Sequence, residues 1–442
     1  MSLFFRRQLR HEIKSWERDG LIDDSQSARL TARYALDALD DEARSTLMNT
    51  IFLVGAALIG CGVIAFVAAH WEEISRTLKV IALLLAMLAA HGTGYWFWRV
   101  RKEPRPHLGH ALTVLGTLIF GANIGLFAQI FHISGDPHQA FLAWAVGALA
   151  VAWALQSVPS AVVAVGACFV GFCLYVDSTG QSFFLFPLLA GHLLLPLSYR
   201  SKSVFLFFLT LIALTTAIIV NAANLAGGVE WRFTQPFIST FAALWLYGQI
   251  HPESGRYPAF GHLARNLGAL GVCTMAYILS FHEVVDEAAW AGRDSAALSD
   301  GYMRAFLVPL SLAAFQVVVA GFMKPRRLAA CVLPLAAGGA LSLALFAPEP
   351  EIYATIAVNA IALGLGAYGI GKGLRDYVRL PYWAGLLLVV LLITGRFFEY
   401  ESHLLIKSAA FIGGGVALIL AGIKFENRLK SRGAAREEVA HG

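Results

Sequence analysis

The chain has 442 residues, of which 57% are hydrophobic and 14% are charged, and its mean hydropathy is +0.64. Soluble domains carry charge on roughly 25% of their residues. This composition excludes a soluble enzyme, a nucleic-acid-binding protein and a disulfide scaffold, and it indicates a protein of the lipid bilayer.

Residues 1–45 precede the first apolar run and are charged throughout. Three apolar residues recur at the spacing of one helix face and predict a first helix near 4–19: Leu9, Ile13 and Trp16. Asp23, with Gln26 three residues later, has the pattern of a capping box at the start of a second helix. The apolar positions of that second helix are Ala28, Leu30, Tyr34 and Leu36. The sequence therefore predicts a small cytoplasmic helical hairpin.

Apolar runs of about 17 to 25 residues follow, each long enough to cross roughly 30 Å of hydrocarbon. They predict fourteen spans, at 46–69, 77–98, 110–131, 139–156, 158–176, 183–199, 203–221, 236–250, 262–281, 304–322, 328–346, 352–370, 380–395 and 404–423. Because some of the turns between runs are tight, thirteen spans is the alternative count. The predicted fold is an all-α polytopic transmembrane helix bundle over 46–423, with the hairpin before it and a basic cytoplasmic tail, 424–442, after it.

The Lys and Arg residues test this topology independently, because cytoplasmic loops near span ends are rich in them. With the N-terminus inside, 27 of the 34 basic residues fall in inner segments. The even number of spans then places both termini in the cytoplasm.

The third predicted span and the turn after it concentrate polar side chains, at Asn123, Gln129, His132 and Asp136. Polar groups at membrane depth must find partners and are often tied to function. We interpret these four residues as a candidate polar path or cavity; packing with interhelical hydrogen bonds is the alternative. His132, Asp136 and His138 are also metal-ligand types, but their loose spacing equally suits a surface turn.

Other polar side chains stand singly in the predicted spans, at His91, His192, Gln316 and Asn359. Each is more typical of one interhelical hydrogen bond than of a proton carrier. Near the outer end of the thirteenth span, Arg396 and Glu399 are three residues apart and predict an ion pair. Binding of an anionic lipid or solute is the alternative interpretation of this pair.

No complete catalytic motif occurs in the sequence. Residues 364–369 read G-x-G-x-x-G, but they follow an apolar span and not a strand, so we interpret them as small residues for helix packing. His282-Glu283 begins a zinc-protease-like pattern that lacks the second histidine. We therefore expect neither enzymatic activity nor a cofactor.

A short internal repeat links the third and ninth predicted spans. Gly109-His110 and Leu115-Gly116 have the same spacing as Gly261-His262 and Leu267-Gly268, and each span ends at Phe-His. Both spans run from inside to outside, so a duplication would be parallel, as between the halves of some transporters.

Three stretches carry a family resemblance. The residues Leu9, Trp16, Gly20-Leu21-Ile22, Ala28 and Tyr34, together with Gly125-Leu126-Phe127-Ala128-Gln129-Ile130-Phe131-His132, resemble the bacterial membrane family called domain of unknown function 2157. Gly395-Arg396-Phe397-Phe398-Glu399, followed by Leu404-Leu405 and Lys407-Ser408, is similar to the end of that family and of domain of unknown function 4401. The resemblance implies a bacterial inner-membrane protein and no established activity.

The number of spans, the intramembrane polar groups and the repeat favour a protein that transports or senses a small solute, lipid precursor or ion. The alternative is a non-transport envelope scaffold or regulator that binds a protein partner through residues 1–45. The two hypotheses differ in whether residues 1–45 are required for function.

Overall fold

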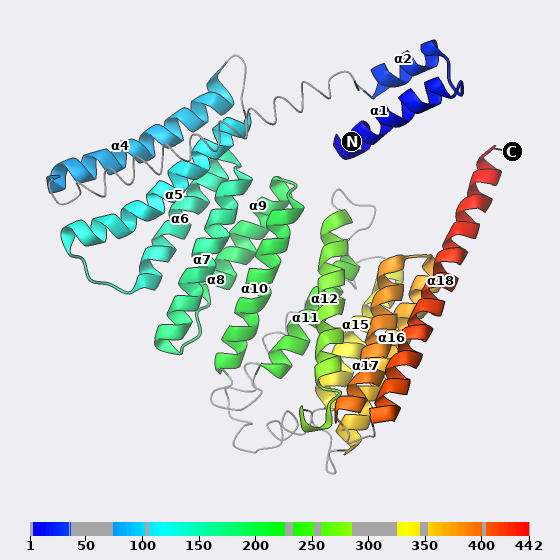
Figure 1. Ribbon diagram of the computed structural model, residues 1–442. Helices are drawn as coiled ribbons and strands as arrows, with labels where there is room; N and C mark the ends of the chain where they lie inside the picture. The colour runs from blue at the N-terminus through cyan, green and yellow to red at the C-terminus, as the bar shows by residue number, and fades with distance from the viewer. Residues whose placement is uncertain are drawn as a thin grey trace. The chain divides into compact units, whose positions relative to one another are not determined.

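The computed structural model describes residues 3–34, 36, 74–101, 106–225, 233–251, 258–284, 325–344, 352–399 and 404–441. All regular structure in these ranges is helical, as Figure 1 shows, which confirms the predicted all-α fold. The chain divides into two compact units, Met1–Ala82 and Leu83–Gly442. The predicted spans 46–69 and 304–322, and with them Gln316, lie outside the described residues.

The predicted N-terminal hairpin consists of α1 (Leu3–Arg18) and α2 (Asp24–Arg33). The capping box is confirmed, because the Asp23 carboxylate accepts from the Gln26 N–H at 2.7 Å and the Gln26 side chain accepts from the Asp23 N–H at 3.1 Å. Hydrogen bonds from the Ser25 hydroxyl and the Gln26 N–H lower the pKa of Asp23. Buried Ile13 and Leu36 form a small core with partly buried neighbours, namely Leu9, Trp16, Ile22, Leu30 and Tyr34. Ala28, expected on the apolar face, is exposed.

Eight helices among the described residues are long and apolar enough to cross a membrane. They comprise α4 (Arg76–Tyr95) with the π-helical turn η1 (Trp96–Val100), α5 (Pro106–Phe131), α6 (Pro137–Leu155), α7 (Val158–Thr179), α10 (Val204–Leu225), α16 (Ile352–Asp376), α17 (Arg379–Glu399) and α18 (Leu404–His441). Each corresponds to a predicted span, so the polytopic architecture is confirmed, whereas the total of fourteen stays a prediction. The last helix continues through the predicted tail to His441.

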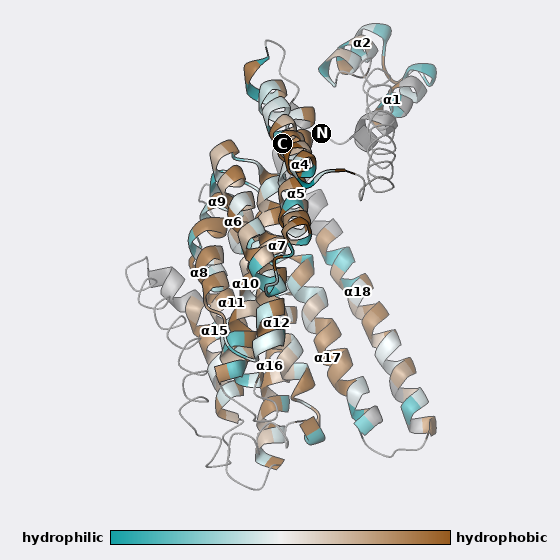
Figure 2. Ribbon diagram, turned by 90° about the vertical axis from the view of Figure 1, so that its left-hand side faces the viewer, coloured by the Kyte–Doolittle hydropathy of each residue, from teal (hydrophilic) through white to brown (hydrophobic). Residues whose placement is uncertain are grey.

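Four more helical segments coincide with predicted spans but are shorter, less apolar or interrupted. They are α8–η2–α9 (Leu185–Leu189, Ala190–Leu194 and Leu195–Arg200), α11 (Thr234–Ile250), α12 (Pro258–Ile278) and α15 (Pro325–Ala344). The span predicted at 183–199 contains a π-helical turn, because Pro196 has no N–H to continue the α-helical hydrogen bonding to residue 192. Figure 2 shows the hydrophobic colouring of these helices and the hydrophilic colouring of α1 and α2.

Two hydrophobic cores organise the larger unit. The first core is formed by residues of α6, α7, α8, η2, α9 and α10. The second core is formed by residues of α11, α12, α15, α16 and α17. A smaller cluster connects α10 with α11 and α12 between these cores, and it consists of Phe207, Leu211, Leu244, Phe260 and Ala264.

Glycines allow the closest helix contacts. A Cβ on Gly268 of α12 would overlap the Trp245 backbone of α11, and one on Gly373 of α16 would lie 2.7 Å from Tyr382 Cα of α17. In the 364–369 motif, Gly366 and Gly369 face α17, whereas Gly364 has open space around it. These contacts confirm the interpretation of that motif as a helix-packing element.

Candidate functional site

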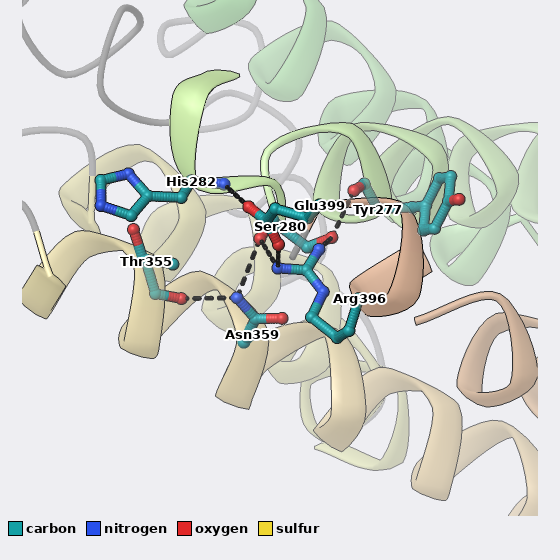
Figure 3. Close-up of polar contacts among 7 residues, drawn as sticks. All are labelled: Tyr277, Ser280, His282, Thr355, Asn359, Arg396 and Glu399. Carbon is teal, nitrogen blue, oxygen red and sulfur yellow. Dashed lines mark hydrogen bonds and ion pairs between the residues drawn. The ribbon is translucent and has the colours of Figure 1, made fainter. Parts of the chain in front are cut away.

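Three helices bring polar side chains and backbone groups together at one end of the second core. The turn after α12 supplies Ser280 and His282, the first part of α16 supplies Thr355 and Asn359, and the last turn of α17 supplies Arg396 and Glu399 (Figure 3). We call these six residues the polar cluster.

The centre of the polar cluster is the backbone that follows α12. Ser280 is fully buried, and its carbonyl lies beyond the end of the helix, where no further turn can supply a donor. Arg396 Nη1 donates to this carbonyl at 2.7 Å and Asn359 Nδ2 donates to it at 3.0 Å. Side chains from two other helices therefore satisfy the end of α12, and the cation lies where the helix dipole favours positive charge.

Charge in the polar cluster is paired but poorly solvated. Arg396 forms an ion pair with Glu399, and the two side chains are only 24% and 9% exposed. Glu399 also accepts a hydrogen bond from the His282 N–H, and Arg396 Nη2 donates to the Ser280 hydroxyl at 2.9 Å. The guanidinium lies 4.8 Å from the centre of the Phe281 ring, which adds a cation–π contact. Arg396 and Glu399 thus form an ion pair across the last turn of α17.

One donor in the polar cluster is left over. Arg396 Nε is buried and has no hydrogen-bond acceptor within the described ranges. A buried donor of this kind requires an explanation, of which a bound water or solute is one. The arrangement can therefore do two things: fix α12 against α16 and α17, and offer a hydrogen bond to a small polar molecule.

The structure separates the four residues of the candidate path in the third predicted span. Asn123 is 3% exposed, and its Nδ2 donates to the Leu83 carbonyl of α4 at 3.2 Å. Gln129, His132 and Asp136 are exposed at the end of α5 and in the turn before α6. Asn123 thus makes an interhelical hydrogen bond, and the other three are not gathered around it.

The remaining predicted polar residues also make local contacts. His91 Nδ1 lies 3.1 Å from the Met87 carbonyl, and His192 Nδ1 lies 2.9 Å from the Leu188 carbonyl. The His138 ring packs edge-on against Tyr175 of α7. Within the described ranges, no group of three His, Cys, Asp or Glu residues could hold a metal ion.

The polar cluster combines two features that the sequence presents separately, namely the Asn359 amide and the ion pair between Arg396 and Glu399. Ser280, the residue that joins them, has no sequence signal of its own, because its importance comes from where α12 ends. Only the arrangement of α12, α16 and α17 reveals that these groups meet.

Residues 14–161 match the sequence model of the family described as "Predicted membrane protein (DUF2157)". The match begins in α1, ends in α7 and supports the resemblance found in the N-terminal part of the sequence. No curated protein and no solved structure matches the chain. The match and the apolar helices together establish a multi-pass membrane protein.

Proposed function

We propose that the protein transports or senses a small solute, lipid precursor or ion, and that Asn359, Arg396 and Glu399 form part of its polar path. The observation that carries this proposal is the poorly solvated ion pair held by three helices. Ionisable side chains at membrane depth are costly and commonly mark solute or ion pathways. An Arg and a Glu beside an amide offer donors and acceptors to a polar molecule that has left water.

Helix contacts at the internal repeat support a transporter-like architecture. In α5, a Cβ on Gly109 would overlap Trp98, and a Cβ on Gly116 would overlap His91. Both Trp98 and His91 belong to the preceding helix, α4 with its π-helical turn η1. In α12, the corresponding Gly268 is opposite Trp245 of α11, and Gly261 is opposite His251, the residue that follows α11. In both copies of the repeat, two glycines at corresponding positions allow the preceding helical segment to pack closely. This correspondence is expected of a parallel duplication.

The proposed orientation places both termini in the cytoplasm of a bacterium and the polar cluster at the outer face of the inner membrane. Exposed Gln129, His132 and Asp136 would belong to a second stretch of the path, near the outer end of α5, whereas Asn123 joins α5 to α4. We also infer that residues 395–411, which contain two members of the polar cluster, are related to domain of unknown function 4401.

Water access to the polar cluster tests this proposal. In a variant without the five native cysteines, Asn359→Cys should react with a charged, membrane-impermeant thiol reagent added from outside, because a solute path admits water. Thr355→Cys, one helical turn nearer the outer end, should react as well. The matched control is Val358→Cys, since Val358 is fully buried in the second core and should stay unlabelled. Labelling is read by mass spectrometry of the folded protein, and failure of both 355 and 359 to react would contradict a path.

A second candidate function is that of an envelope scaffold or regulator. The observation that favours it is the hairpin of α1 and α2, which has its own capping box and its own small core.

A further inference from the structure

A cavity of about 250 Å³ lies among α10, α11 and α12, apart from the polar cluster. Its walls include apolar side chains from all three helices, chiefly Leu211, Ile212, Phe237, Phe241, Leu267 and Leu270. Most of these residues lie near the middle of their helices, the part of a span that sits deepest in hydrocarbon, whereas Phe237 lies in the first turn of α11.

The chemistry of the cavity suits an apolar occupant. Thr215 is one of the threonines in its wall, and its hydroxyl is already used, donating to the Leu211 carbonyl of the same helix at 2.8 Å. The remaining wall is largely aliphatic and aromatic. An apolar cavity of roughly 150 Å³ can stay free of water and bind benzene, so this larger one favours hydrocarbon over water.

The mouth of the cavity opens on the exposed surface of the helices. Ile212 and Leu270 line it and are 42% and 62% exposed. Ile212 belongs to α10, one of the eight helices able to cross a membrane. A phospholipid chain in contact with α10 can therefore enter the cavity without leaving the hydrocarbon region.

We propose that the acyl chain of a membrane phospholipid occupies this cavity. The site lies beside the small cluster that connects the first and second cores, so the bound chain supplies packing contacts where the two cores meet. Phe241 forms one side of the site, with its ring against Gly271 of α12. This inference does not depend on the proposed transport function.

Photocrosslinking tests the proposal on the full-length protein in detergent micelles. The probe is phosphatidylglycerol with a diazirine in one acyl chain, and labelled residues are mapped by mass spectrometry. We expect saturable labelling of the cavity walls that excess ordinary phosphatidylglycerol abolishes. The same chain on phosphatidylcholine should label equally, because the site recognises hydrocarbon and not a headgroup.

Two variants and one control sharpen this test. Thr274→Trp and Ile212→Trp narrow the mouth from α12 and from α10, and each should lose the saturable labelling. Thr93→Trp, a change of an exposed threonine in α4, should retain it. Non-saturable labelling in the wild type, no stronger than that of exposed Leu85 and Leu88 on α4, would overturn the proposal. Saturable labelling that persists in a correctly folded mouth variant would also overturn the proposal. If neither variant folds, the competition between the probe and ordinary phosphatidylglycerol on the wild-type protein decides the outcome.

Discussion

Replacement of Arg396 by leucine is expected to destabilise the protein by about 3–5 kcal/mol, because it leaves a buried carboxylate without its cation. Glu399 is 9% exposed, and among the described residues its remaining partner is the His282 N–H. The change also removes two hydrogen bonds to Ser280 at the end of α12. The measurement is the loss of helical circular dichroism as the purified protein is unfolded with increasing mole fractions of dodecyl sulfate.

Two further variants separate the charge effect from simple loss of a long side chain. The double variant Arg396→Leu with Glu399→Leu should recover much of the lost stability, since replacing a whole buried ion pair by apolar residues is often neutral. Arg375→Leu removes a side chain that is 74% exposed from its contact with Asp376, and should cost no more than about 1 kcal/mol. An Arg396→Leu protein as stable as the Arg375→Leu protein would contradict the buried-charge explanation.

Gly268→Ala is expected to force α11 and α12 apart and to destabilise the protein by about 1–3 kcal/mol, the usual cost of overpacking. The added Cβ would overlap the backbone nitrogen of Trp245 and would lie 2.5 Å from its Cα. Backbone atoms cannot turn aside as a flexible side chain can, so the helices themselves must move. The same unfolding experiment measures the effect.

The matched control for this substitution is Gly364→Ala in α16. Its Cβ would meet nothing within 4 Å. The alanine should be neutral or stabilising by up to about 1 kcal/mol, because glycine is the poorer helix former. Equal effects of the two substitutions would show that helix propensity, and not the close contact between α11 and α12, sets the stability at residue 268.

The sequence predicts elements well where one local rule decides them. Asp23 and Gln26 predict the start of α2 because a capping box involves only neighbouring residues. The helices follow from apolar run length, whereas the π-helical turn before Pro196 is a detail of hydrogen bonding that hydropathy does not report. The partners of Asn359 were unpredictable for a different reason, since they depend on which helices lie side by side. The hydrogen bond from Asn123 to the Leu83 carbonyl likewise depends on α4 and α5 lying side by side. The presence of a polar residue at membrane depth does not by itself distinguish a packing contact from a solute path.

The side of the membrane on which the polar cluster lies is the most direct test of this account. A reporter that is active only outside the cytoplasm can be fused after Leu298, downstream of α12, and separately after Arg327, near the start of α15. We expect activity for the fusion after Leu298 and none for the fusion after Arg327. The reverse pattern would place the ion pair of Arg396 and Glu399 at the cytoplasmic face and would contradict a path that opens to the outside.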